Sequence, residues 1–276
     1  MRVGLITADA GHPLLAGAAA ALGPEHEVVV LDPRDADAEA VAAGARADVY
    51  LLKARDPRAL ELARALERRG APVVNTAAAT ELCQDRTEMA DLARRAGLPF
   101  AATTAFPSLD RLARQAGDGS GLPGPAGLSG QRWPVVVKSR RSRKGDLVAR
   151  VDDPARLWEL AAGWGEEPVV VQAFAPNNGW DHKLYAIGDR VFAGLRRSEM
   201  APEGPEDDRS VTAPPARWAE LTLRVGEVFA LDVYGVDIID TGDGAPLIVD
   251  VNAFPGMRGR PGAPEALAAL ALRRAG

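Results

Sequence analysis

The chain has 276 residues, of which 47% are hydrophobic and 26% are charged, a composition typical of a folded protein with room for two or three compact units. Its formal net charge of −5 argues against general affinity for nucleic acid, which requires an excess of lysine and arginine on one surface. The single cysteine excludes an internal disulfide, and three histidines with one cysteine make no zinc site of familiar spacing.

The N-terminus opens directly on a β-rich run, without the apolar core and cleavage site of a signal peptide. The alanine-rich run at 16–22 is too short to span a bilayer. We therefore expect a cytoplasmic protein with no membrane contact.

The first third of the chain alternates short β-rich runs with helical runs. Strands are expected at 2–7, 27–31, 49–52 and 73–74, and helices at 14–22, 36–43 and 57–69. This order predicts a small parallel sheet with helices on both faces. Asp85 then stands where it can cap an amphipathic helix that ends at Gly97.

The middle of the chain contains a misleading glycine motif. A strand at 102–105 and a helix at 108–116 lead into the segment 117–130, which is rich in glycine and proline and includes a literal GxGxxG at 119–124. The motif follows a helix, and Pro123 and Pro125 forbid the helix whose N-terminus would hold a pyrophosphate. We interpret the segment as a loop.

Further strands and helices are expected in the remainder of the chain. The strands fall at 134–138, 146–151, 169–174, 183–187 and 190–195, and the helices at 154–164, 215–231 and 264–274. The acidic, proline-rich stretch 198–215 is expected to be irregular and to lie over a site as a mobile cover.

The last strand pair carries the strongest chemical signal. The runs 233–240 and 246–253 are apolar and β-branched, so they should be buried neighbours joined by a turn at 241–244. Asp237 interrupts the first run, and Asp250 and Asn252, which share a face, interrupt the second. Buried carboxylates are costly unless they are paired or metal-bound, and an all-oxygen set suits Mg²⁺. The alternative is that Asp237 begins a turn and Asn252 caps the loop 254–256.

The ordered motifs Gly235-Val236-Asp237, Val249-Asp250-Val251-Asn252 and Pro255-Gly256 resemble the C-terminal signature of ATP-grasp enzymes. The resemblance is nearest to the ribosomal-protein glutamate ligase (RimK-like) branch, with a side resemblance to the inositol polyphosphate kinases of the same fold. It implies an α/β protein with the ATP-grasp fold. A Rossmann-like parallel-sheet domain at 1–98 would precede two α+β subdomains, at 99–173 and 174–276, that enclose ATP.

The same resemblance implies the cofactors and the nucleotide contacts. Asp237, Asp250 and Asn252 would hold Mg²⁺, two ions in number, for which Mn²⁺ can substitute. Lys138, at a strand end, would contact the α- and β-phosphates as a point charge. Main-chain groups near Gln172, Ala173 and Phe174 would lie along the adenine.

The resemblance also implies catalytic residues. Lys183 would lie near the transferred phosphate, and Asp181 would orient it or touch the ribose. One of Arg196 and Arg197 would stabilise charge on the γ-phosphate, and we favour Arg196 because alternation lets only one face the site. Arg86 stands where many relatives have a lysine, so it would contact phosphate or be an ordinary first-turn residue.

Two basic segments have open roles. The run 140–144 is densely basic, which indicates an anionic second substrate, a tighter phosphate clamp or a solvated turn. Lys53 and Arg55 follow the third strand, at the edge of a parallel sheet where ligands tend to bind. Solvated charge is the alternative for both.

These features lead to an ATP-dependent ligase that joins a small-molecule or peptide carboxylate to an amine through an acyl phosphate, releasing ADP and phosphate. The alternatives are a kinase that phosphorylates a hydroxyl of a small anionic metabolite such as an inositol phosphate, and a nucleotide-binding protein without turnover. A homodimer is the common assembly for this class. Because the two carboxylates would repel each other, Asp250→Asn is expected to be neutral or mildly stabilising without metal.

Overall fold

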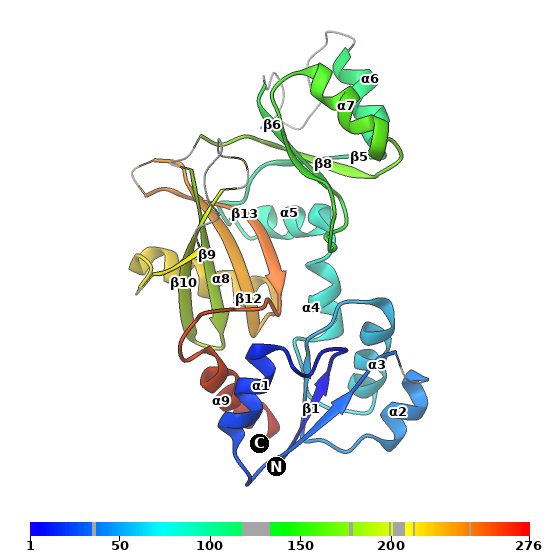
Figure 1. Cartoon of the computed structure of the whole chain (residues 1–276), viewed down its shortest axis with the longest axis vertical. Coiled ribbons are helices and arrows are strands. Elements are labelled where there is room, and N and C mark those ends of the chain that lie inside the picture. The colour runs from blue at the N-terminus through cyan, green and yellow to red at the C-terminus, as the bar shows by residue number, and fades with distance from the viewer. Residues whose placement is uncertain are drawn as a thin grey trace.

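The computed structural model describes residues 1–34, 37–117, 133–176, 179–198, 200, 208–211, 213–242 and 244–276. Three sheets follow one another along the long axis of the molecule (Figure 1). The N-terminal sheet lies at one end with both chain termini, a five-stranded sheet lies in the middle, and a smaller four-stranded sheet lies at the far end. No helix in the described segments is both long and apolar enough to cross a bilayer.

The N-terminal sheet is parallel, as the sequence predicts, with strand order β2-β1-β3-β4. Helices pack on both of its faces in two separate apolar clusters, one containing α1 and the other containing α2 and α3. The strands are β1 (Arg2–Ile6), β2 (Glu27–Leu31), β3 (Val49–Leu52) and β4 (Val73–Val74). The helices are α1 (Pro13–Leu22), α2 (Ala38–Gly44) and α3 (Pro57–Arg68).

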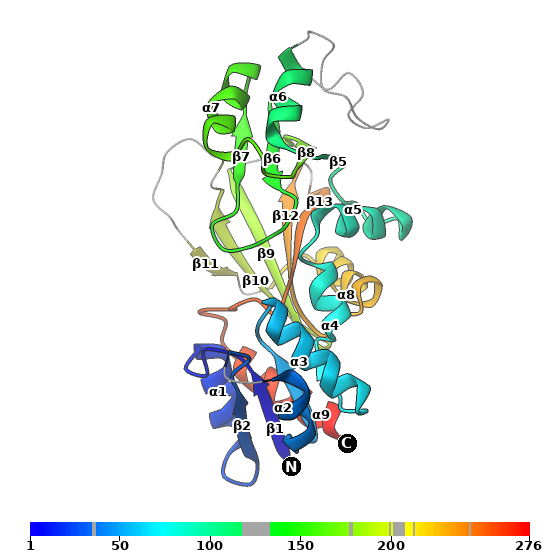
Figure 2. The same ribbon diagram turned by 90° about the vertical axis from the view of Figure 1, so that its right-hand side faces the viewer.

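Two short helices lead away from this sheet. The sequence analysis missed α4 (Ala77–Leu82), whose six residues are too few to show helical periodicity. The predicted cap at Asp85 is confirmed, because its carboxylate accepts the backbone N–H groups of Thr87 and Glu88 at the start of α5 (Arg86–Arg95). Helix α5 packs beside α8 (Ala216–Phe229) under the middle sheet (Figure 2).

The far sheet is antiparallel, with strand order β5-β8-β6-β7 and helices α6 and α7 packed on it. Its strands are β5 (Thr103–Phe106), β6 (Val135–Ser139), β7 (Val148–Val151) and β8 (Val169–Ala173). The helices are α6 (Leu109–Gly117) and α7 (Pro154–Trp164). The GxGxxG at 119–124, interpreted as a loop, lies outside the described residues.

The middle sheet is also antiparallel, with strand order β11-β10-β9-β12-β13, and α8 covers one face. Its strands are β9 (Trp180–Ile187), β10 (Arg190–Arg197), β11 (Asp208–Val211), β12 (Val233–Asp240) and β13 (Pro246–Ala253). The expectation of irregular structure throughout 198–215 is wrong at β11. Its backbone pairs with β10, whose outer edge would otherwise expose unpaired hydrogen-bonding groups.

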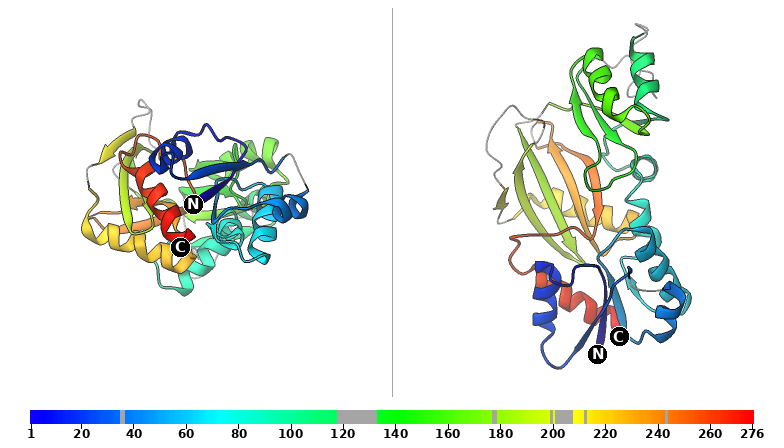
Figure 3. Two further views of the ribbon diagram at one scale, coloured as in Figure 1. Left: turned by 90° about the horizontal axis from the view of Figure 1, so that it is seen from below. Right: turned by 45° about the vertical axis from the view of Figure 1, so that its right-hand side comes forward.

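The last helix, α9 (Ala263–Ala275), returns to the N-terminal sheet and lies beside α1 (Figure 3). The contact is close, because a Cβ on Gly17 would come within 2.8 Å of the Pro264 side chain. Buried residues of α1, α9, β1 and β3 form one apolar cluster that also includes Phe254 and Met257. This cluster joins the N-terminal sheet to the loop that follows β13.

The packing of α8 on β12 provides a stability test. A Cβ on Gly226 would come within 2.3 Å of the buried Tyr234 hydroxyl, which donates to the Thr222 carbonyl at 2.8 Å. Gly226→Ala should therefore lower the free energy of unfolding by about 1–3 kcal/mol through overpacking, as measured by urea titration. The control is Gly163→Ala in α7, where no atom lies within 4 Å and a gain of about 0.5–1 kcal/mol is expected. Equal effects of the two substitutions would contradict this packing.

Candidate active site

The two faces of the middle sheet differ in chemistry. Leu184, Val236 and Ile238 are buried in the apolar cluster with α8. His182 also turns to that side and meets Trp218 edge-on, with ring centroids 4.7 Å apart, so it is a packing residue. Strand alternation sends Asp181, Lys183 and Tyr185 to the opposite, polar face.

A cavity of about 300 Å³ lies between this polar face and the far sheet. It brings together every site residue named from the sequence except Arg197. These lining residues are Arg86, Lys138, Gln172, Ala173, Phe174, Asp181, Lys183, Arg196, Asp237, Asp250 and Asn252. Arg197 lies instead over the ring of Trp180, with Cζ 5.8 Å from its centroid.

One end of the cavity is apolar. Val136 and Val148 line it from the far sheet, and Ile239 and Val249 line it from the middle sheet. The Gln172 side chain points toward β5, where it donates to the Thr103 hydroxyl at 3.0 Å. This end is a slot between two sheets whose walls suit a flat aromatic ring.

The other end is charged and centres on two facing aspartates. Asp237 and Asp250 are direct partners in the pairing of β12 with β13. Lys183 Nζ donates to Asp237 Oδ2 at 2.7 Å, and although burial opposes its charge, this carboxylate raises the pKa of Lys183. Lys138 is buried and donates to the Val249 carbonyl at 2.9 Å. Burial lowers the pKa of Lys138, and Asp250 acts in the opposite direction.

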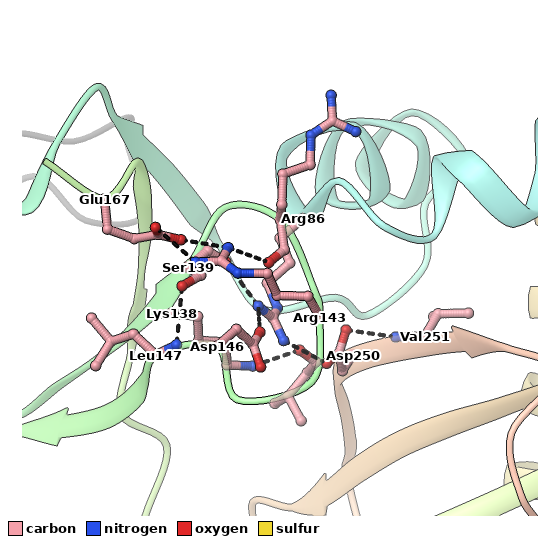
Figure 4. A network of polar contacts seen from close by, with 11 residues as sticks. Arg86, Lys138, Ser139, Arg143, Asp146, Leu147, Glu167, Asp250 and Val251 are labelled. Atoms are coloured by element: carbon pink, nitrogen blue, oxygen red, sulfur yellow. Dashed lines mark hydrogen bonds and ion pairs between the residues drawn. The ribbon is translucent and has the colours of Figure 1, made fainter. Parts of the chain in front are cut away.

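Arg86 connects this end to two other parts of the molecule (Figure 4). Its NH1 donates to the Ser139 carbonyl at 2.8 Å and to Asp146 Oδ2 at 2.6 Å, and its NH2 donates to Asp250 Oδ2 at 3.3 Å. Burial opposes the charge of Arg86, but Asp250 and Asp146 raise its pKa. The guanidinium thus holds α5, the β6–β7 segment and β13 together.

These contacts correct one expectation. The two aspartates do not form an unrelieved pair of like charges, because Asp237 is paired with Lys183 and Asp250 with Arg86. Removing the charge of Asp250 would break a largely buried ion pair, so the structure favours destabilisation by Asp250→Asn over the neutral or stabilising effect expected from the sequence.

The donor set fits a metal that binds together with phosphates. Among the described residues no three His, Cys, Asp or Glu side chains gather as a metal cluster. The cavity is lined by three carboxylates, those of Asp181, Asp237 and Asp250, and by the amide of Asn252. Mg²⁺ is usually held by one or two carboxylates plus substrate phosphates, so this set is sufficient for a nucleotide-bound ion.

The basic run 140–144 has partners within the protein. Arg140 donates to both oxygens of the fully buried Asp85, at 3.0 and 3.1 Å, and Arg143 pairs with Glu167 at 2.7 Å. Burial opposes ionisation of Asp85, but the hydrogen bond from Arg140 lowers its pKa. These two arginines therefore fasten the β6–β7 segment to Asp85 and Glu167. As expected for the solvated turn considered from the sequence, the exposed residues of the run include Arg141, Arg143 and Lys144.

A second cavity, of about 570 Å³, adjoins the first and extends to the N-terminal sheet. The two share Lys183, Arg196, Asp237 and Asn252, so the charged end of the first opens into the second. The second is also lined by Lys53, Ala54, Arg55, Tyr185, Gly235, Ala253, Phe254, Pro255 and Gly256. Tyr185 was missed from the sequence, although its spacing of two from Lys183 places both on one face.

A larger groove, of about 1120 Å³, runs between the N-terminal sheet and α8. Its charged lining includes the ion pairs Asp189–Arg273 and Asp232–Arg274. It lies apart from both aspartates of the polar face, and we assign it no chemistry.

Solved structures with similar folds identify the class of protein. A RimK domain ATP-grasp protein from Sphaerobacter thermophilus superposes with a TM-score of 0.75, at 24% identity over 98% of this chain and 99% of that one. The ATP-grasp ligase PsnB, in complex with a minimal precursor, Mg and ADP, superposes with a TM-score of 0.70, at 17% identity over 100% of this chain and 97% of that one. The chain therefore has the predicted ATP-grasp fold.

Sequence comparison shows which ATP-grasp domain family the second half of the chain matches. Residues 128–262 match the RimK-like ATP-grasp domain family. A probable alpha-L-glutamate ligase of Rhodopirellula baltica is 28% identical over 136 residues, which are 46% of this chain and 33% of that protein. Residues 128–262 are therefore similar to the RimK-like ATP-grasp domain, and the matched region spans a third of that relative's length.

The aspartate pairing leads to a test of Asp250. In the metal-free protein, Asp250→Asn leaves Arg86 with Asp146 as its remaining carboxylate partner, which should lower the free energy of unfolding by about 1–3 kcal/mol. It should also weaken Mg-ATP binding at least tenfold, as measured by calorimetry. Asp240→Asn is the matched control, because it makes the same change on β12 outside the cavity lining. A destabilised Asp250→Asn protein with normal Mg-ATP affinity would contradict the metal assignment.

Proposed function

We propose that this protein is an ATP-dependent ligase that activates a carboxylate as an acyl phosphate and transfers it to an amine, releasing ADP and phosphate. The observation that carries the proposal is the junction of the two cavities, where Lys183, Arg196 and Asp237 line both. A phosphoryl group held at the charged end of the first cavity faces an acceptor that enters from the second. The ligase names of similar proteins support the same reaction class.

The first cavity would hold the nucleotide. Its apolar slot suits adenine, with Ala173 and Phe174 along the edge of the base, and Asp181 would touch the ribose or orient Lys183. Lys138 would contact the α- and β-phosphates. Asp237, Asp250 and Asn252 would hold Mg²⁺, which supplies neutralisation of charge on the β- and γ-phosphates.

The chain's own cations would act on the transferred group. An acceptor carboxylate oxygen attacks the γ-phosphorus while the bond to the ADP oxygen breaks. Arg196, whose planar guanidinium can hold two phosphate oxygens, would stabilise the charge that develops there. Lys183 would share that role. An amine then attacks the acyl carbon, phosphate leaves, and the surplus proton of the amine passes to solvent.

The fate of the γ-phosphate tests the reaction. A ligase releases phosphate in step with ADP only when both carboxylate and amine are present, and with hydroxylamine as the amine it accumulates a hydroxamate. A kinase instead yields ADP and a phosphorylated product without stoichiometric phosphate. Binding of Mg-ATP with neither outcome, across a panel of carboxylates, amines and hydroxyl acceptors, would contradict the proposal and leave a nucleotide-binding protein.

Adjacent arginines give a matched pair for the catalytic assignment. Arg196→Met should lower kcat by about 10²–10³-fold while leaving ATP binding nearly unchanged, because its contact is made to charge that develops during transfer. Arg197→Met, next to it on β10 but turned toward Trp180, should keep kcat within about twofold of the wild type. Steady-state kinetics of both variants measure these kcat values. A larger loss of kcat in Arg197→Met than in Arg196→Met would overturn the role of Arg196.

A further inference from the structure

Lys53 occupies a fixed position at the mouth of the second cavity. It directly follows β3, and its backbone N–H donates to the Ile6 carbonyl at 3.0 Å, which extends the parallel ladder. Two residues later, the Arg55 carbonyl accepts from the Gln84 side chain at 2.9 Å. The N-terminal sheet therefore presents Lys53 and Arg55 together on the wall that faces the middle sheet.

The ammonium group of Lys53 has no carboxylate partner within ion-pair distance among the described residues. The ammonium group lies over the face of Phe254 instead, with Nζ 5.8 Å from the ring centroid. Burial lowers the pKa of Lys53 to about 8, with Arg55 and Arg258 adding to the effect and Asp9 opposing it. A half-buried cation without a counterion costs stability, so Lys53 is a candidate for binding an anion.

The charges of the second cavity lie at two ends. Lys183 and Arg196 line the end that is shared with the nucleotide cavity, and Lys53 and Arg55 line the opposite wall. Asp237 is the one carboxylate among the described lining residues, and it is already paired with Lys183. An acceptor with a single carboxylate, seated at the phosphoryl end, would leave the far wall without a counterion.

His12 adds a neutral donor near this wall. Its Nδ1 accepts the N–H of Leu14 at 3.2 Å, so its proton lies on Nε2. Nε2 is 3.4 Å from the position of a Cβ on Gly256, at the rim of the cavity. Burial lowers the pKa of His12, and Lys53 and Arg258 lower it further, which favours this neutral donor form.

Building on the proposed ligase function, we propose that the acceptor is dianionic. One carboxylate would be phosphorylated beside Lys183 and Arg196, and a second would be bound across the cavity by Lys53 and Arg55. The two N-terminal side chains would then set the specificity of the reaction without taking part in its chemistry.

The first test uses the empty protein. Lys53→Met should raise the melting temperature at pH 7, because it removes a desolvated charge and keeps a similar apolar stem. The folded pKa of about 8 lies below the ordinary lysine value of 10.5, so the penalty is fully present below pH 8. It disappears as the pH rises to 10.5, and the advantage of the variant should shrink across that interval. A lower melting temperature for Lys53→Met would show a structural role and overturn the inference.

The second test measures acceptor binding by calorimetry on protein loaded with Mg²⁺ and a non-hydrolysable ATP analogue. Succinate, glutarate and adipate are compared with their monoamides, which keep the shape and lose one charge. At least one dicarboxylate should bind about tenfold or more tightly than its monoamide. Lys53→Met and Arg55→Met should remove that preference and leave nucleotide affinity unchanged. Lys144→Met, an exposed lysine outside both cavities, is the control and should keep the preference.

The outcomes separate this inference from the ligase proposal. The dianionic acceptor is overturned if no dicarboxylate binds more tightly than its monoamide. It is also overturned if Lys53→Met weakens the binding of a dicarboxylate and of its monoamide equally. A preference that depends on Lys53 without hydroxamate formation keeps the anion site and overturns the ligase. Hydroxamate formation that is unchanged in Lys53→Met and Arg55→Met supports the ligase and overturns the anion site.

Discussion

The structure depends on one buried cation, the guanidinium of Arg86. It donates to Asp146 and Ser139 of the far unit and to Asp250 of the middle sheet, while its own backbone begins α5. Taking such a charge out of water is tolerable only because carboxylates and a carbonyl surround it. The same contact therefore fixes how two sheets face each other and holds a carboxylate at the charged end of the nucleotide cavity.

This arrangement balances opposite charges within the site. In the empty protein Asp237 is paired with Lys183 and Asp250 with Arg86. A metal ion and a triphosphate that enter together bring opposite charges, so the carboxylates can turn to the metal while the released cations turn to phosphate oxygens. Lys53 differs, because in our proposal its countercharge comes from the acceptor.

Periodicity and turn chemistry predicted the N-terminal sheet, the strands β12 and β13 and the cap at Asp85, because each depends on neighbours in sequence. The strand β11 was missed because its pairing with the edge of β10 is a tertiary effect. The partner of Arg86 at Asp146 had no local signal, since the two are 60 residues apart. The division of the chain at 1–98, 99–173 and 174–276 and the homodimer stay proposals.

The most direct test of this account is a calorimetric titration of the protein with Mg²⁺, with and without a non-hydrolysable ATP analogue. Two carboxylates that are already paired with cations should bind the ion weakly by themselves. The account therefore predicts that affinity for Mg²⁺ rises at least tenfold with the analogue present, and that Asp250→Asn abolishes this rise. Tight Mg²⁺ binding without nucleotide, or an undiminished rise in Asp250→Asn, would contradict it.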